Sequence, residues 1–331
     1  MLIMAGTGLL LATLLLSVLA LKSLTAPLPG VNAPVLFVVT PGSSLSGIGQ
    51  QLAAEELISN RRLFVLWARW RGYSSAIQAG EYLLEPGISS TELLNKLVSG
   101  DHIQYRLTLV EGWTIEQALG AIWNSVKVSR QLDAYDPQQI MELLNVDYAS
   151  PEGILFPDTY FYTAGTSDIA LLQRAHTRLN SVLAEAWESR VGALPFESSY
   201  EALILASLVE KESALASERG QIAGVFVRRL ELGMRLQSDP TVLYGMSRSF
   251  VGDIRRSDLA TETPYNTYRV DGLPPTPIAL TGRGAIMATM QPEITDALYF
   301  VGRGDGSHQF SATLQEHNDA VNLYQRGNLQ Q

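Results

Sequence analysis

The sequence contains no cysteine and only four histidines among its 331 residues. Without cysteine the chain has no disulfide framework, no thiolate metal site and no cysteine nucleophile. The four histidines do not follow a metal-binding spacing such as HExxH; they are His102, His176, His308 and His317. We therefore expect no catalytic metal and no cofactor.

Long runs of like charge are also absent. The formal net charge is −9, and the 24 lysine and arginine residues are scattered along the chain. A nucleic-acid-binding surface requires clustered basic residues, so we exclude that class of partner. At 46% hydrophobic residues, the chain is a folded protein with room for two domains.

One apolar stretch lies at the amino terminus, where Leu2 to Leu21 contains no charged side chain. About 20 helical residues at roughly 1.5 Å each span the roughly 30 Å hydrocarbon core of a bilayer. We expect residues 1–22 to form an uncleaved transmembrane anchor. The alternative is a signal peptide, but the apolar run is longer than a signal peptide's usual core of roughly 7 to 15 residues, and no clear cleavage site follows.

The residues after this stretch are rich in proline. Pro27, Pro29, Gly30 and Pro34 lie within residues 23–34, a composition typical of an extended linker. We expect this segment to be a tether between the membrane and the folded part.

Three short segments combine glycine, a serine or threonine cap and apolar residues at helical spacing: Pro41–Leu45, Pro86–Ser90 and Glu111–Ile115. Each predicts a turn that leads into a capped helix. In the first part of the chain we predict the order strand, helix, helix, strand over residues 35–39, 45–57, 63–70 and 81–84. This order resembles a LysM module, a small fold known for binding glycans that contain N-acetylglucosamine.

A LysM-like module at residues 35–110, including a linker, would hold glycan; the alternative is a spacer that binds nothing. Trp67, Trp70 and Tyr73 are candidates for stacking on sugar rings. However, Leu63, Leu66, Trp67 and Trp70 recur at helical spacing, which favours a place in the core.

The rest of the chain, residues 111–331, is predicted to be one larger domain, with the boundary near residues 105–125. We predict helices over residues 169–190, 201–215 and 221–232, short strands around Tyr268, 298–301 and 309–310, and a final helix. The predicted fold class is α+β.

Two carboxylates appear near the end of an apolar helix, at Glu210 and Glu212. At about 100° per residue they point roughly 200° apart, so they cannot both face one cleft. Glu212 shares a face with Leu205, Leu208 and Val209. A carboxyl among aliphatic groups has a raised pKa and can deliver a proton near neutral pH. The alternative is an ordinary buried ion pair of Glu212 with Arg219 or Arg228.

The motifs around Glu212 closely resemble those of the MltG (YceG-like) endolytic murein transglycosylases. The resemblance begins near residue 35, and no other family known to us has these motifs in this order. It rests on Phe156–Tyr160, Ala206–Ser213, Ser217–Arg219, Gly233–Gly245, Pro264–Tyr268, Gly272–Pro275 and Leu298–Val301.

The resemblance implies that Glu212 is the catalytic acid, followed by Ser213 as in the Glu-Ser signature of several lytic transglycosylases. It implies cleavage between N-acetylmuramic acid and N-acetylglucosamine with formation of a 1,6-anhydro ring. Candidate sugar contacts are Gln237, Asp239, Thr241, Tyr244, Tyr265, Asn266, Thr267 and Tyr268, because hydroxyls and amides match sugar groups. The alternative is that Asp239 and the segment Tyr265–Asn266 only build turns.

The resemblance also implies a single-pass inner-membrane protein with its catalytic domain on the periplasmic or wall side. Its partners would be peptidoglycan glycan strands and the penicillin-binding proteins that polymerise them. Two other interpretations remain open at this point: a non-catalytic scaffold that binds the wall, and a muramidase-type hydrolase that uses Asp239, Glu152, Asp158 or Glu218 as a second carboxylate.

Overall fold

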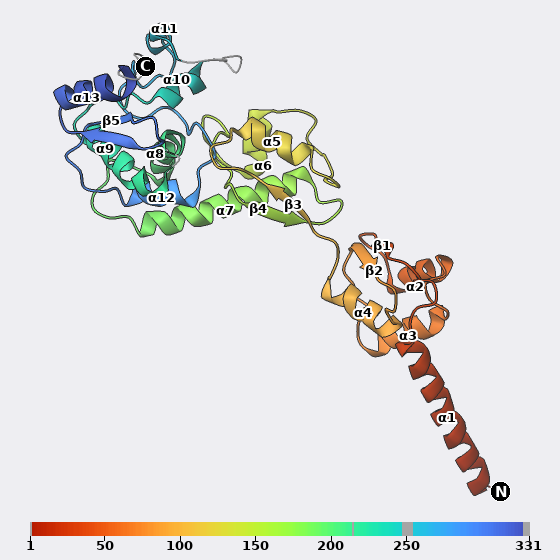
Figure 1. Cartoon of the computed structure of the whole chain (residues 1–331). Helices are drawn as coiled ribbons and strands as arrows, with labels where there is room; N and C mark the ends of the chain where they lie inside the picture. The colour runs from red at the N-terminus through yellow and green to blue at the C-terminus, as the bar shows by residue number, and fades with distance from the viewer. Residues whose placement is uncertain (1, 214, 247–253, 327–331) are drawn as a thin grey trace. The chain divides into compact units, whose positions relative to one another are not determined.

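A computed structural model describes residues 2–213, 215–246 and 254–326. The chain divides into two compact units (Figure 1). Unit 1 comprises residues 1–105 and 161–165, and unit 2 comprises residues 106–160 and 166–331. The sequence placed its boundary between residues 110 and 111, whereas the contacts divide the chain after Tyr105 and return residues 161–165 to unit 1.

Unit 1 begins with helix α1 (Leu2–Thr25) and contains the predicted order of strand, helix, helix and strand. Strands β1 and β2 pair antiparallel, with Val35 opposite Leu84 and Val39 opposite Gly80. Ser44 and Ser89 cap the helices that follow them, as their spacing predicted. The elements are β1 (Val35–Val39), α2 (Leu45–Ala54), α3 (Arg61–Trp70), β2 (Gly80–Leu84) and α4 (Ser90–Ser99).

The predicted tether belongs instead to the core of unit 1. Leu24, Leu28 and Val31 are 4%, 5% and 3% exposed. The amide of Leu28 donates to the carbonyl of Ile88 over 2.8 Å, and the hydroxyl of Thr91 donates to the carbonyl of Leu24 over 3.2 Å. The prolines favour an extended path, but Leu28 and Val31 between them belong to the buried core cluster of unit 1, so this segment is not a free linker.

Helix α3 buries the predicted face only in part: Leu63 and Trp67 are half-buried, and Trp67 packs against the core. Phe64, Val65 and Ala68 are its buried residues, whereas Leu66 and Trp70 are 65% and 74% exposed. The spacing of the tryptophans suits a core position, but Phe64 and Val65 take buried positions on the side of α3 that contacts α2. Among the described residues, no helix has both the length and the hydropathy of a membrane-spanning segment.

Unit 2 is a mixed α/β domain, in agreement with the predicted α+β class. Its capping box at Thr114 confirms the third predicted cap. The elements that follow β3 (Tyr105–Thr108) are α5 (Ile115–Trp123), α6 (Pro137–Leu144), β4 (Thr159–Tyr162), α7 (Asp168–Glu188), α8 (Ser199–Glu212), η1 (Ala216–Glu218), α9 (Arg219–Glu231), α10 (Asp239–Gly245), α11 (Arg256–Leu259), α12 (Arg283–Met290), β5 (Tyr299–Gly302), β6 (His308–Ser311), α13 (Leu314–Val321) and η2 (Asn322–Arg326).

Helix α8 lies inside unit 2, in contact with α7, α9, α10 and α12 (Figure 1). Its residues from Ala202 to Val209 are all buried. A helix that is apolar on every side is stable in water only when other elements surround it. The carboxyl end of α8, which carries Glu210 and Glu212, is therefore held in a fixed position.

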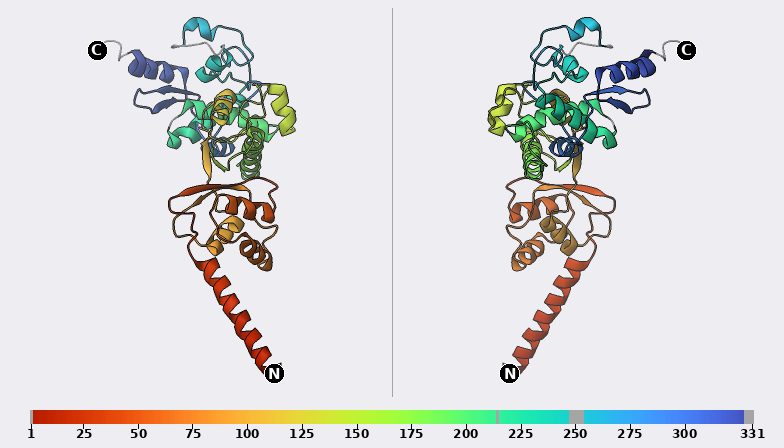
Figure 2. Two further views of the ribbon diagram at one scale, coloured as in Figure 1. Left: turned by 90° about the vertical axis from the view of Figure 1, so that its right-hand side faces the viewer. Right: turned by 90° about the vertical axis from the view of Figure 1, so that its left-hand side faces the viewer.

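Strands β5 and β6 form an antiparallel hairpin in which Tyr299 lies opposite Ser311 and Gly302 opposite His308. Helix α13 packs beside this hairpin (Figure 2). The strand predicted around Tyr268 is wrong. The side-chain amide of Asn266 donates to the carbonyls of Leu259 and Thr261, and this closes the backbone into turns.

Candidate active site

The end of α8 opens on a cavity of about 380 Å³ within unit 2. Residues from α8, α9, the turn leading into α10, the segment around Tyr268, the β5–β6 hairpin, α13 and η2 line it. They are Glu212, Arg229, Leu236, Gln237, Asp239, Tyr268, Tyr299, Phe300, Val301, Gly302, His308, Leu314, His317, Val321 and Gln325.

Glu212 is the last residue of α8 and the only carboxylate that this helix contributes to the cavity lining. The hydroxyl of Ser238 donates to its Oε1 over 2.5 Å. Burial raises the pKa of Glu212 from 4.5 to about 7; the Ser238 hydrogen bond opposes this rise, the charge of Asp239 adds to it and that of Arg229 opposes it. Glu212 can therefore hold a proton near neutral pH.

A network of buried threonines holds Ser238 in place. The amide of Ser238 donates to the Thr267 hydroxyl over 2.9 Å. The Thr241 hydroxyl donates to the Ser238 carbonyl over 2.6 Å and lies 2.8 Å from the Thr267 hydroxyl. Thr241 and Thr267 are both 0% exposed. We expected them to contact sugar, but they lie beneath the cavity and position the turn that carries Ser238.

Three other predicted residues do reach the cavity: Gln237, Asp239 and Tyr268. The Tyr268 hydroxyl donates to Asp239 Oδ1 over 2.6 Å. The backbone of Gln237 is left-handed, with φ of 53°, and its backbone N–H donates to the carbonyl of Thr267. The structure thus brings these three residues together with Glu212, while their contact with substrate stays a prediction.

The remaining predicted residues, Tyr244, Tyr265 and Asn266, lie outside the cavity lining. The Tyr244 hydroxyl donates to Glu152 Oε2 over 3.2 Å. The Tyr265 hydroxyl lies 2.9 Å from that of Thr276. Asn266 stabilises the turns, because its side-chain NH₂ group donates to two backbone carbonyls and its Oδ1 accepts from the backbone N–H of Tyr268. For Asn266, the turn-building alternative is correct.

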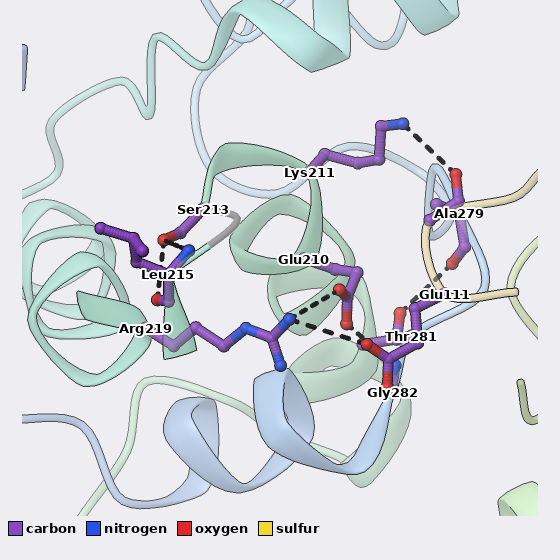
Figure 3. Close-up of polar contacts among 10 residues, drawn as sticks. Glu111, Glu210, Lys211, Ser213, Leu215, Arg219, Ala279, Thr281 and Gly282 are labelled. Atoms are coloured by element: carbon purple, nitrogen blue, oxygen red, sulfur yellow. Dashed lines mark hydrogen bonds and ion pairs between the residues drawn. The ribbon is translucent and has the colours of Figure 1, made fainter. Parts of the chain in front are cut away.

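As the helical spacing predicted, Glu210 does not line the cavity of Glu212; it lies in a polar network with Arg219 and Glu111 (Figure 3). Arg219 Nη2 lies 3.1 Å from Glu210 Oε1 and 3.7 Å from Glu111 Oε2. The other oxygen of Glu210 accepts from the amide of Gly282 over 3.0 Å. Glu210 is therefore a buried structural carboxylate that ties α8 to α9 and to the start of α12.

The suggested ion pair of Glu212 with Arg219 or Arg228 is wrong. Arg219 pairs with Glu210 and Glu111, and Arg228 lies 3.6 Å from Asp296. Among the described residues, the cation that acts on Glu212 is Arg229, through its charge. Arg229 is 6% exposed, and it donates to the carbonyls of Leu298 and Leu236 over 2.6 and 2.7 Å.

The sequence prediction missed several residues that line the cavity, among them Arg229, Tyr299, His308 and His317, and it missed Ser238, which hydrogen-bonds Glu212. The signal for Ser238 was its position between Gln237 and Asp239, two predicted sugar contacts. Arg229 lies four residues after Val225, on the inward side of α9, and this spacing was the signal. The other three come from β5, β6 and α13, and no local pattern connects these elements with α8.

The cavity wall around His317 and Arg229 combines aromatic faces with polar groups. The ring of His317 stacks on Tyr299 with 5.2 Å between centroids, and burial followed by the charge of Arg229 lowers the pKa of His317. Aromatic faces beside polar groups suit a sugar ring. Within the described residues, no group of three or more His, Asp or Glu side chains is arranged to hold a metal ion.

A proton-carrying carboxyl that opens on a cavity in a rigid α/β domain is the arrangement of an enzyme that uses general acid catalysis. Residues 37–323 match the YceG-like family, and the chain belongs to that family.

Named relatives agree with this assignment. The chain is 32% identical over 321 residues to the endolytic murein transglycosylase of Bacillus subtilis, covering 92% of this chain and 88% of that protein. It is 28% identical to the endolytic murein transglycosylase of Streptococcus pneumoniae, covering 85% of this chain but only 56% of that protein.

A solved structure shares the fold. The crystal structure of a YceG-like protein from Listeria monocytogenes superposes with a TM-score of 0.56 at 27% sequence identity, and the match covers 86% of this chain and 98% of the Listeria chain.

Proposed function

We propose that this chain is an endolytic murein transglycosylase that cuts peptidoglycan glycan strands and leaves a 1,6-anhydro-N-acetylmuramic acid end. The chain is a lyase of the lytic transglycosylase class. The observation that carries the proposal is Glu212, a carboxyl with a pKa of about 7 that lines a cavity. The substrate class, murein, is inferred from the relatives named endolytic murein transglycosylase.

In the first step Glu212 is the general acid. It protonates the glycosidic oxygen between N-acetylmuramic acid and N-acetylglucosamine as the bond to the muramyl anomeric carbon breaks. Positive charge develops on the muramyl ring, as in an oxocarbenium ion. Ser238 donates to Glu212 Oε1, and this contact orients the carboxyl and stabilises the carboxylate that forms.

In the second step the Glu212 carboxylate acts as the base. It accepts the proton of the muramyl 6-hydroxyl, whose oxygen attacks the anomeric carbon and closes the 1,6-anhydro ring. The carboxyl is thereby regenerated without water. The single Glu212 side chain thus serves both steps.

The two alternative functions are not favoured. A scaffold would not require a protonated carboxyl in a cavity. A hydrolase would require a second carboxylate to activate water. Glu152 is buried outside the cavity lining and accepts from the amides of Ile115 and Gly153. Glu218 and Asp158 also lie outside the lining, and Asp239 accepts from Tyr268.

The test is mass spectrometry of the products that the full chain, solubilised in detergent, releases from purified glycan strands. We expect 1,6-anhydro ends with the wild type and none with Glu212→Gln. The control is Glu201→Gln, the same chemical change at the other end of α8, which should keep activity. Reducing ends would indicate a hydrolase, and no cleavage by the folded wild type would favour a scaffold. A rapid fall in mean strand length would mark internal cutting.

We propose that residues 2–21 anchor the protein in the cytoplasmic membrane as a single span, with the catalytic domain on the periplasmic or wall side. The support is the sequence itself, which has no charged residue in this segment. The test is extraction of cell membranes with sodium carbonate, followed by protease treatment of spheroplasts. Release by carbonate, or protection of unit 2 from protease, would contradict the proposal.

We also propose that residues 35–110 form a LysM-like module that holds glycan. Exposed Trp70 is stacked on Trp67 with 5.1 Å between ring centroids, and such a pair suits sugar stacking. The test is co-sedimentation with insoluble peptidoglycan in the Glu212→Gln background. We expect Trp70→Ala to weaken binding; unchanged binding would favour a spacer.

The expected protein partners are the penicillin-binding proteins that polymerise glycan, because an anchored cutter can act on strands still attached at the membrane and end their elongation. In vivo photo-cross-linking from exposed positions of unit 2 tests this proposal. Failure to recover any glycan polymerase would argue against it.

A further inference from the structure

His308 lies on the side of the cavity formed by the carboxyl-terminal hairpin. It is the first residue of β6 and lines the same cavity as Glu212. Its ring meets Phe300 edge to face, with 5.5 Å between centroids and an interplanar angle of 88°. Phe300 thus fixes the plane of the ring, and Nδ1 and Nε2 point in different directions.

Glu218, at the end of η1, holds His308 by two contacts. The backbone amide of His308 donates to Glu218 Oε1 over 3.0 Å. Nδ1 lies 2.8 Å from Glu218 Oε2, and each side chain is only 14% exposed. Because a carboxylate accepts and does not donate, the proton of a neutral imidazole lies on Nδ1. The lone pair is then on Nε2.

Nε2 is the nitrogen of His308 that is left for a ligand. Within the described part of the chain it makes no hydrogen bond, and it is not among the buried polar atoms that lack a partner. An accessible acceptor on a cavity-lining side chain, with its tautomer held by a carboxylate, is the arrangement that positions a donor group of a ligand.

We propose that His308 Nε2 accepts a hydrogen bond from a hydroxyl of the bound glycan, and that Glu218 is a positioning residue that holds the required tautomer. This inference rests on the proposed function, since it takes the glycan as the ligand. The contact places the sugar ring against the hairpin while Glu212 acts from α8. No bond to His308 forms or breaks.

The principal variant is His308→Asn. The amide nitrogen of asparagine can lie where Nδ1 lies, so the contact with Glu218 is kept, while Nε2 and the ring contact with Phe300 are lost. We expect normal folding and roughly a tenfold loss of kcat/KM for glycan cleavage, the size expected for one hydrogen bond. Glu218→Gln should lower kcat/KM similarly, because an amide oxygen accepts only one of the two N–H groups and the amide NH₂ favours the other tautomer.

Nitrogen NMR of the imidazole gives a readout that does not depend on turnover. In the Glu212→Gln background, free His308 should be the Nδ1–H tautomer, and purified glycan strands should shift its Nε2 resonance toward lower frequency. Glu218→Gln should reduce the Nδ1–H population. The matched control is Glu185→Gln, which removes an ion pair with Arg283 outside the cavity lining and should change neither readout.

The outcomes separate the two proposals. If His308→Asn cleaves glycan with the same kcat/KM as the wild type, the role of His308 is overturned and the proposed function stands. A wild type that does not cleave glycan would overturn the function, and a glycan-induced Nε2 shift would then still support the contact. A doubly protonated His308 ring, or no Nε2 shift with glycan, would overturn the contact itself.

Discussion

Two glutamates that lie two positions apart on α8 have different surroundings. Glu210 is paired with Arg219 and with the amide of Gly282. Glu212 has only the Ser238 hydroxyl as a direct hydrogen-bond partner among the described residues. For both, burial raises the pKa above the ordinary value. The two differ in their surroundings: Glu210 is held by Arg219 and Gly282 beside a separate cavity, while Glu212 lines the cavity shared with Arg229 and His308.

Ser238 sets the pH range in which Glu212 can act. Its hydrogen bond lowers the pKa of Glu212, because the hydroxyl stabilises the charged carboxylate. We predict that Ser238→Ala moves the alkaline limb of the kcat/KM profile from near pH 7 to higher pH. Activity at the optimum should fall by about tenfold, since the carboxyl loses its orienting contact. The measurement is kcat/KM for glycan cleavage between pH 5 and 9. A limb that stays in place or moves to lower pH would show that Ser238 does not stabilise the carboxylate.

The raised pKa of Glu212 also makes a prediction about stability. Below pH 4.5 the carboxyl is protonated in both the folded and unfolded states and has no effect. Between pH 4.5 and about 7 the unfolded chain ionises first, so stability is lost as pH rises. Glu212→Gln has no such loss and keeps an acceptor for Ser238. We therefore expect it to be more stable than the wild type by up to about 3 kcal/mol at pH 8 and equal to it at pH 4.

Thermal unfolding at both pH values measures this difference, with Glu201→Gln as the control. A variant that is less stable than the wild type at pH 8 would mean that the carboxylate of Glu212 is satisfied in the folded protein.

At the scale of elements, sequence analysis succeeded where the determining contacts are local. The caps at Ser44, Ser89 and Thr114 were predicted because a cap and its target lie within three residues of each other. Strand β1 was predicted at its observed bounds, and the three helices around the site were found within a few residues of theirs.

It failed where contacts distant in sequence decide the outcome. Thr241 and Thr267, 26 positions apart, bind each other beneath the cavity, and neither segment alone indicates this. The prediction that Glu212 is catalytic came by a different route, from the family motif, because the helical pattern alone left an ion pair open; Glu212 lines the cavity, and its catalytic role stays a prediction. His308 reaches the cavity through the hairpin of β5 and β6, which nothing near Glu212 in the sequence suggests.

The segment expected to be a tether makes a prediction of its own. Because Leu24, Leu28 and Val31 are buried in unit 1, a chain that begins at Lys22 should keep the stability of this unit. A chain that begins at Pro34 loses all three side chains, and unit 1 should be destabilised by on the order of 5 kcal/mol. The measurement is chemical unfolding of the two truncated chains, followed by the fluorescence of Trp67 and Trp70. Equal midpoints would restore the view of residues 23–34 as a free linker.

At the scale of the whole molecule, each of the two units has a hydrophobic core of its own. The core of unit 1 is built from β1, β2, α2, α3 and α4 around Phe37, Phe64 and Tyr82. That of unit 2 surrounds α8, whose residues from Ala202 to Val209 are buried. Units with separate cores are expected to unfold as separate cooperative units. We therefore predict two transitions in calorimetry of the full chain.

Substitutions in one unit should move only its own transition. Glu210→Ala leaves Arg219 without its closest partner and the amide of Gly282 without an acceptor. Breaking such a buried pair costs about 3 kcal/mol or more, which lowers the midpoint of unit 2 by roughly 6 to 12 °C. Starting the chain at Pro34 should lower only the midpoint of unit 1, and combining the two changes should add their effects. A single transition that both changes shift would mean that the two units unfold as one, and the stability of unit 1 would then also determine the stability of unit 2.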